Sequence, residues 1–354
     1  MPITPHLKHA AKLILPLVLS LILISCGPEA EPTATAQAAE TSSTVEGLAF
    51  IGTAGLPAGF DAQGHRGARG LLPENTLPAF EAALDLGATT LELDMHFTAD
   101  GEVVIWHDPI IDKSKCRLPD GADEAIPNPR NPLRRIFISQ QPLDIVQSYQ
   151  CDQNPDPGRF PDQTARAMPL AGSDYRIVTL RELFDFVAQY AESELKSEAQ
   201  RANALTIQFN IETKRDPNHP EYIDDGFTGG EVGPFEEAVL ALIAEYGWEE
   251  RIVIQSFDHR SLRTIREVNG SIRLAALTTG GEAKIKVYNG YKFDIWSPNA
   301  NDVTVERIAE AHELGLQVIP WTVNEPDQMQ ALIDLGVDGL ISDRIDLLLA
   351  LELD

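Results

Sequence analysis

The chain has 354 residues, of which 43% are hydrophobic and 23% are charged, and this composition excludes fibrous and wholly disordered proteins. Its formal net charge of −26 argues against nucleic acid as a partner, because nucleic-acid affinity comes largely from lysines and arginines that neutralise phosphates. The length is compatible with two domains, but an α/β barrel that carries one insertion fits equally well.

Residues 1–25 have the order of an export signal. Lys8 and Lys12 precede an apolar run from Leu13 to Ile24, and Cys26 follows directly after Ser25. The stretch resembles a bacterial lipoprotein signal peptide, in which the cysteine is lipidated and becomes the first residue of the mature protein. We therefore predict an exported protein that lipid on Cys26 anchors to the membrane of the cell envelope. The alternative is an uncleaved membrane anchor.

The residues after Cys26 predict a flexible tether over 26–58, followed by a folded domain over 59–354. Residues 27–48 are rich in Pro, Thr, Ala, Ser and Glu, a composition that buries too little apolar surface to fold. Gly27 stands where some lipoproteins carry an aspartate that retains them at the inner membrane. A location on the periplasmic face, with the outer membrane favoured, is therefore expected.

The two remaining cysteines, Cys116 and Cys151, predict a disulfide. If Cys26 carries lipid, they form an even pair in an oxidising compartment, and their spacing matches no zinc motif. Such a bond would stabilise the fold by roughly 3–4 kcal/mol. Two buried free thiols are the alternative.

From residue 60 onward, short apolar strands alternate with amphipathic helices. The predicted parallel strands are 60–65, 89–95, 205–211, 251–256, 272–277, 293–297, 316–321 and 338–341. The predicted helices are 76–86, 235–246, 260–268, 303–314 and 326–335. Residues 103–106 follow the second strand so closely that they predict an antiparallel hairpin arm. Eight strands with crossover helices favour an α/β fold of the (β/α)8 TIM-barrel type over an open doubly wound sheet.

Residues 109–178 interrupt this pattern and predict an insertion after the second strand. They hold ten of the 24 prolines and little periodicity. Catalytic groups of this fold lie at the carboxyl ends of the strands, so the insertion should border the active site.

Polar side chains lie at or near the carboxyl ends of the first two predicted strands. His65 and Arg66, between two glycines, pair an imidazole with a guanidinium that suits a phosphate oxyanion. Glu92 and Asp94 are two residues apart in a strand and project to the same face, which is costly unless a cation compensates them. The hairpin arm then ends in His107-Asp108.

The third predicted strand leads to the same rim. Glu212 and Lys214 are again two residues apart and add a third carboxylate and a cation. Glu92, Asp94 and Glu212 together form an all-oxygen ligand set that suits Mg²⁺ or Ca²⁺ rather than zinc. A single histidine or carboxylate is more often structural, but these side chains gather at the ends of neighbouring strands. Of the other histidines, His96 and His259 are interpreted as supporting or structural residues.

The ordered motifs resemble those of the glycerophosphodiester phosphodiesterase family, of the exported bacterial lipoprotein type. The resemblance spans nearly all of residues 60–350 and rests on His65-Arg66-Gly67, Glu74-Asn75-Thr76, Glu92-Leu93-Asp94, His107-Asp108, Glu212-Thr213-Lys214, Gln255-Ser256-Phe257 and Trp321-Thr322-Val323-Asn324. It implies that His65 and His107 are the acid/base pair and that Glu92, Asp94 and Glu212 hold the metal. It further implies that the following residues bind substrate or phosphate: Arg66, Lys214, Gln255 and Trp321.

The resemblance implies that a divalent cation, Ca²⁺ or Mg²⁺, assists the hydrolysis of glycerophosphodiesters to sn-glycerol 3-phosphate and an alcohol. Two alternatives stay open. A phospholipase C- or D-like phosphodiesterase acting on intact lipid would need an exposed apolar rim around the same site. A non-catalytic lipoprotein that binds phosphodiesters could dispense with one histidine. Which histidine is the acid, and whether water or a neighbouring glycerol hydroxyl attacks first, stays open from the residues.

Overall fold

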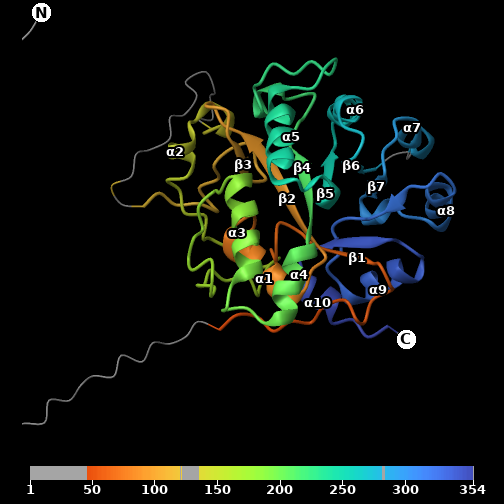
Figure 1. The fold of residues 1–354 in the computed structure, drawn as a ribbon, viewed down its shortest axis with the longest axis horizontal. Coiled ribbons are helices and arrows are strands. Elements are labelled where there is room, and N and C mark those ends of the chain that lie inside the picture. Colours follow the sequence, from red (N-terminus) through yellow and green to blue (C-terminus); the bar gives the residue numbers. More distant parts are fainter. Residues whose placement is uncertain (1–45, 120, 122–134, 281–283, 354) are drawn as a thin grey trace, which may run out of the picture. The chain divides into compact units, whose positions relative to one another are not determined.

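The structure is a computed structural model that describes residues 46–119, 121, 135–280 and 284–353 (Figure 1). The chain divides into two units, Met1–Ser43 and Thr44–Asp354, and the helices and strands named below belong to the second. The predicted apolar run from Leu13 to Ile24 and the predicted lipidation site Cys26 lie outside the described residues. Among the helices of the described part, none is both long enough and apolar enough to cross a membrane.

The described strands form one sheet whose eight parallel members follow the order β8-β7-β6-β5-β4-β2-β1-β9, with β3 antiparallel beside β2. The strands are β1 Asp61–Gly64, β2 Thr90–Phe97, β3 Val103–Ile105, β4 Gln208–Thr213, β5 Ile252–Ser256, β6 Arg273–Thr278, β7 Ile295–Pro298, β8 Gln317–Val318 and β9 Gly339–Ser342. Backbone hydrogen bonds from Asp338 N to Val318 O and from Ile341 N to Pro320 O join the two ends of this order. The predicted barrel and its hairpin arm are confirmed.

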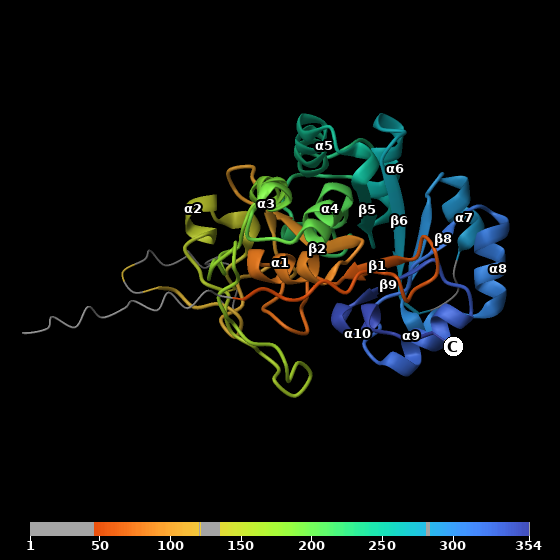
Figure 2. The ribbon, with the colours of Figure 1, turned by 60° about the horizontal axis from the view of Figure 1, so that its bottom comes forward.

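Helices surround the strands, as Figures 1 and 2 show. They are α1 Leu77–Leu86, α2 Leu143–Val146, α3 Leu180–Glu192, α4 Glu198–Thr206, α5 Pro234–Tyr246, α6 His259–Val268, α7 Ile285–Gly290, α8 Val305–Glu313, α9 Pro326–Asp334 and α10 Ile345–Leu349. The main core lies between helices and sheet, where Leu91 and Leu93 of β2 are fully buried. A smaller apolar cluster that includes Val253, Ile295 and Ile341 comes from strands β5 to β9.

Two predicted strand boundaries are wrong. Leu205 belongs to α4, because a capping box between Ser197 and Gln200 starts a helix that runs to Thr206. The fourth strand therefore begins at Gln208 and continues through Glu212. Strand β8 ends at Val318, short of the predicted residue 321, although Ile319 N and Trp321 N still donate to Trp296 O and Pro298 O of β7. Helices α2, α3, α4, α7 and α10 were not among those predicted.

The insertion over residues 109–178 forms its own small core on the barrel. In the described part it contains only short helical pieces, Ile138–Gln140 and α2. Its apolar side chains pack on Val104 and Trp106, which lie in and directly after the hairpin arm. Cys116 and Cys151 are joined by a disulfide. The insertion is thereby attached to the segment that leads into His107.

The predicted tether is too long at its carboxyl end. Leu48 N donates to Asp85 Oδ2 at 3.1 Å, and Ile51 N donates to Leu86 O at 3.0 Å. Leu56 is buried. The residues around 48–56 therefore pack against α1, and the folded unit begins before residue 59. Composition predicted the tether, but Leu48 and Leu56 pack with the main core and hydrogen bonds join this stretch to α1.

Candidate active site

The turn after β1 brings His65 and Arg66 to the carboxyl end of the barrel. Arg66 has a left-handed backbone with φ of 52°, and Gly67 follows with φ of 83°. A Cβ on Gly67 would lie 2.6 Å from the backbone carbonyl carbon of Ala79 in α1, so this position requires glycine. The next helix begins as predicted, with Thr76 as N-cap accepting from Ala79 N.

Strand pairing places the three predicted carboxylates together. Asp94 and Glu212 are register partners in neighbouring strands, and Glu92 lies two residues before Asp94 on the same face. Each residue offers a carboxylate oxygen within 4.8 Å of the others, and all three residues are buried. This group, Glu92, Asp94 and Glu212, is called the carboxylate cluster below.

Two cations already lie against the carboxylate cluster. Lys214 Nζ is 2.9 Å from Glu212 Oε1 and 3.4 Å from Asp94 Oδ1, while Arg66 Nε is 3.2 Å from Asp94 Oδ2. Burial and the neighbouring Asp94 nevertheless raise the pKa of Glu92 well above its ordinary value. Burial likewise raises the pKa of Glu212 to about 7, although Lys214 opposes the shift.

Three carboxylates lie against the two cations Arg66 and Lys214, so full ionisation of the carboxylate cluster would leave a net negative charge. An all-oxygen set with excess negative charge is what a hard divalent cation requires, so the residues fit Ca²⁺ or Mg²⁺. They do not fit zinc, which prefers nitrogen and sulfur ligands.

A chain of buried amides supports the carboxylate cluster from inside the barrel. Gln255 Nε2 donates to Glu92 Oε1 at 2.7 Å, and Asn210 Nδ2 donates to Gln255 Oε1 at 3.1 Å. Asn210 also donates to Gln63 Oε1 at 2.8 Å. The Gln255 amide, which the family resemblance assigned to the substrate, thus holds Glu92 in place. Its contact with phosphate stays a prediction.

His65 is oriented by Asp343, which directly follows β9. The two side chains meet at 2.6 Å between Nδ1 and Oδ1, and Nε2 lies 3.8 Å from Glu92 Oε2. Asp343 is itself fixed, because Asn324 Nδ2 donates to its other carboxylate oxygen at 2.8 Å. Burial lowers the pKa of His65 even though Asp343 opposes this. The neutral ring is held with Nε2 toward the carboxylate cluster.

His107 has a parallel arrangement at the end of the hairpin arm. Its Nδ1 donates to Asp108 Oδ1 at 2.8 Å, and Lys115 of the insertion donates to Asp108 Oδ2 at 2.6 Å. Burial and the nearby Arg66 charge lower the pKa of His107 to about 4. His96, interpreted as a supporting residue, contacts the His107 carbonyl through Nε2 at 3.2 Å. Each predicted catalytic histidine therefore has a carboxylate on its Nδ1.

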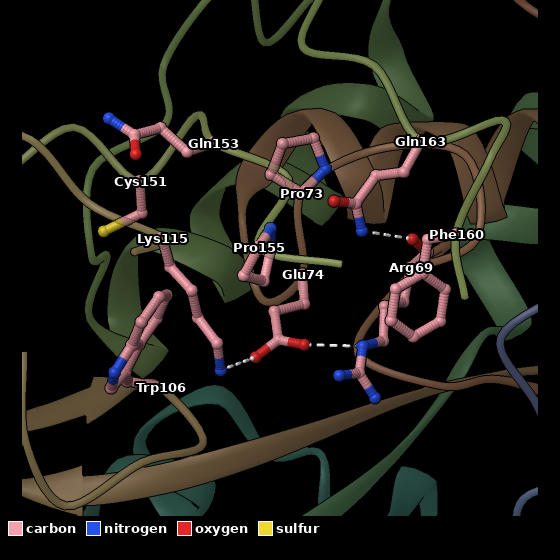
Figure 3. Close-up of a pocket in the computed structure, with 10 residues that line it drawn as sticks. All are labelled: Arg69, Pro73, Glu74, Trp106, Lys115, Cys151, Gln153, Pro155, Phe160 and Gln163. Atoms are coloured by element: carbon pink, nitrogen blue, oxygen red, sulfur yellow. Dashed lines mark hydrogen bonds and ion pairs between the residues drawn. The ribbon is translucent and has the colours of Figure 1, made fainter. Parts of the chain in front are cut away.

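Glu74 joins Arg69 of the first turn to Lys115 of the insertion (Figure 3). Its Oε2 is 2.6 Å from Arg69 Nε and 3.0 Å from Arg66 Nη1, and its Oε1 accepts from Lys115 at 2.8 Å. Burial opposes ionisation of Glu74, but these three cations lower its pKa to about 2. The Arg69 guanidinium also lies over the Phe160 ring at 4.5 Å, so the insertion borders this part of the site as expected.

A cavity of about 470 Å³ lies beside the carboxylate cluster. His107, Glu212 and Lys214 line it together with two aromatic side chains, Tyr222 and Phe257. The Phe257 ring meets Trp321 edge to face at 5.6 Å between centroids. Trp321, predicted to bind substrate, is therefore attached to the wall of the cavity through Phe257.

Four side chains of this network were not predicted to take part: Arg69, Glu74, Lys115 and Asp343. A signal existed for Asp343, because it directly follows the last parallel strand, where groups of this fold do chemistry. Glu74 belonged to a motif of the family resemblance, which gave it no role of its own. Nothing in the local sequence distinguishes Lys115 from Lys113, since only the folded insertion places one of them against Asp108.

Cleavage of a phosphodiester requires groups that move protons and positive charge that stabilises the phosphate. Two imidazoles with carboxylate partners and the cations Arg66 and Lys214 together offer both. The barrel and its rim therefore define a phosphodiester hydrolase of the TIM-barrel class. The sequence profile of the glycerophosphoryl diester phosphodiesterase family matches residues 65–347, and the chain belongs to that family.

Known relatives cover most of the chain. A glycerophosphodiester phosphodiesterase from Caldanaerobacter subterraneus subsp. tengcongensis is 27% identical over 81% of this chain and 95% of its own length. A lysophospholipase D from Rattus norvegicus is 25% identical over 79% of this chain and 82% of its own length.

Solved structures show the same fold. A candidate glycerophosphoryl diester phosphodiesterase from Silicibacter pomeroyi has a TM-score of 0.64 and 28% identity, and the match covers 81% of this chain and 92% of that chain. A phosphodiesterase from Oleispira antarctica, solved with its product sn-glycerol-3-phosphate, has a TM-score of 0.57 and 18% identity. That match covers 81% of this chain and 94% of the other.

Proposed function

We propose that the chain hydrolyses glycerophosphodiesters and releases sn-glycerol 3-phosphate and an alcohol, with a divalent cation bound by Glu92, Asp94 and Glu212. The proposal rests mainly on one observation. Two carboxylate-paired histidines, the carboxylate cluster and the cations Arg66 and Lys214 all lie on the same rim of the barrel. The activity of the Caldanaerobacter relative and the product bound to the Oleispira protein support the choice of substrate.

In this mechanism His65 and His107 divide the proton transfers. Burial lowers both pKa values, which favours the neutral form that accepts a proton from the nucleophile at Nε2. The other ring must enter the reaction as imidazolium, a form that the negative charge of a bound phosphate favours, and it gives its Nε2 proton to the leaving alcohol oxygen. Asp343 and Asp108 stabilise the imidazolium form of their respective histidines. Arg66 and Lys214 neutralise the non-bridging oxygens, and the bound cation would supply further stabilisation of the charge that develops on the phosphate.

A second candidate substrate is a lysophospholipid. The relative from Rattus norvegicus is named a lysophospholipase D, and Tyr222 and Phe257 offer apolar surface on the cavity wall. Glycerophosphodiesters are favoured by the activity of the Caldanaerobacter relative and by the charged side chains on the cavity wall, such as Asp216 and Lys214, although Pro109 and Pro217 add to its apolar surface.

The experiment that tests this proposal compares kcat/KM for glycerophosphocholine, lysophosphatidylcholine and phosphatidylcholine. We expect glycerophosphocholine to be the best substrate by at least about tenfold, a difference of about 1.4 kcal/mol in transition-state stabilisation. A preference for lysophosphatidylcholine would assign the chain to lysophospholipid cleavage, and binding without turnover would assign it to a binding protein.

We also propose that the chain is exported and anchored to the cell envelope through lipid on Cys26. The support is the order of Lys8, Lys12, the apolar run from Leu13 to Ile24, and Cys26. The variant Cys26→Ser should move phosphodiesterase activity from the membrane fraction to the precursor or soluble pool. If the variant fractionates like the wild type, the apolar run is itself the anchor.

A further inference from the structure

Lys115 belongs to the insertion, yet its ammonium group lies among side chains of the active site. Nζ is 2.6 Å from Asp108 Oδ2, 2.8 Å from Glu74 Oε1 and 5.4 Å from the centre of the Trp106 ring. Figure 3 shows the lysine between Trp106 and the Glu74 carboxylate. Its side chain is only 12% exposed. Such a long side chain, held by contacts with three residues, has lost most of its rotamer freedom.

The two carboxylates depend on Lys115 to different degrees. Glu74 also contacts Arg66 and Arg69, so it keeps two cations if the lysine is removed. Asp108 would keep no such cation, because Lys115 is the one lysine or arginine paired with it within the described residues. Its other oxygen accepts from His107 Nδ1. Loss of Lys115 would therefore act mainly on the Asp108–His107 pair.

The backbone around Lys115 is fixed as firmly as its side chain. Its N–H donates to Asp112 O at 3.0 Å, and its carbonyl accepts from Gln153 N at 3.1 Å. The next residue, Cys116, is bonded to Cys151, which itself donates to Tyr175 O at 2.8 Å. The disulfide segment thus holds the lysine at one place relative to Trp106, the residue directly before His107.

We propose that Lys115 is a positioning residue for His107. It holds the Asp108 carboxylate where it receives the Nδ1–H of His107, which leaves Nε2 for the substrate in the adjoining cavity. Glu74, His107 and Asp108 offer ligand atoms within 4.8 Å of one another, and the ammonium of Lys115 contacts both carboxylates of this group. This inference rests on the proposed function, since it assigns the lysine a part in proton transfer by His107.

The test compares Lys115→Met, which keeps the length of the side chain without its charge, with Lys113→Met at a neighbouring exposed lysine. We expect Lys115→Met to lower kcat about 10- to 100-fold, the range seen when partners that orient functional groups are lost, with KM within about twofold. Lys115→Arg should recover most of the loss, and Lys113→Met should match the wild type. A kcat for Lys115→Met within twofold of the wild type would overturn the proposal.

A double-mutant cycle with Asp108→Asn separates positioning from a general structural role. If Lys115 acts through Asp108, then Lys115→Met should cost less than about twofold in kcat once Asp108 is neutral. A further tenfold loss in that background would contradict the proposal. The double variant removes a cation and an anion together, so this comparison remains available if Lys115→Met alone does not fold.

A third readout does not depend on the substrate. Nitrogen-15 NMR of the histidine rings should show His107 protonated at Nδ1 in the wild type and a mixture of tautomers in Lys115→Met. An unchanged tautomer in the variant would overturn the role of Lys115, whatever the assays reveal about glycerophosphodiesters. Failure of the wild type to cleave any of these substrates, with the tautomer change present, would instead contradict only the proposed function.

Discussion

Replacing His65 or His107 with alanine should lower kcat about 10²- to 10⁴-fold, the range expected when a positioned acid or base is removed from proton transfer. Both rings lie on the rim of the barrel and outside its layered core, so the fold should persist. His312→Ala is the matched control, because this exposed histidine of α8 pairs with Asp338, which precedes β9 at the end of the barrel opposite the site. Steady-state kinetics, with the melting temperature of each variant, checks the prediction.

Variants of the carboxylates that pair with the two histidines should lower kcat less than loss of the histidine itself. Asp343→Asn keeps the shape of the side chain but loses the charge that stabilises the His65 imidazolium, so its kcat should fall between those of the wild type and His65→Ala. Wild-type turnover by His65→Ala or by His107→Ala would remove that histidine from the mechanism. A loss of melting temperature as large as the loss of activity would point to folding as the cause.

Removal of divalent cations should lower activity at least about 100-fold, and added Ca²⁺ or Mg²⁺ should restore it. The physical reason lies in the carboxylate cluster. Without a cation, Arg66 and Lys214 are engaged by Asp94 and Glu212, and Glu92 is too destabilised by burial to ionise normally. A bound cation would neutralise the carboxylates and make the two basic side chains available to phosphate.

The measurement is turnover before and after chelation and dialysis, with elemental analysis of the protein. Glu92→Gln should lose the response to added cation, whereas Glu245→Gln, at an exposed glutamate on the outer side of α5, should keep it. Full activity in protein that contains no metal by elemental analysis would contradict this prediction.

The barrel and the members of its rim were predictable because strand periodicity and strand ends are local properties. Glu92 and Asp94 are two residues apart, so a β-strand alone puts them on one face. The register that sets Asp94 beside Glu212 follows once both strands belong to one parallel sheet. The boundary of β4 was wrong because a capping box, a signal of helix initiation, extended α4 into an apolar stretch.

The partners of the two histidines were less accessible to prediction. Asp343 is 278 residues from His65 in the chain, and the two meet only because β9 pairs with β1 when the barrel closes. Lys115 depends on the course of a proline-rich segment with almost no regular structure, which no periodicity describes. Its position follows from the disulfide and from the small core around Trp106, and both are products of tertiary packing.

The most direct measurement is a phosphorus-31 NMR time course of the wild type with glycerophosphocholine and Ca²⁺ or Mg²⁺. Hydrolysis on the choline side of the phosphate should produce sn-glycerol 3-phosphate and free choline, and a chelator should stop the reaction. Phosphocholine as the product would mean that the site cleaves the other ester bond. An unchanged glycerophosphocholine resonance in the presence of cation would contradict the proposed function.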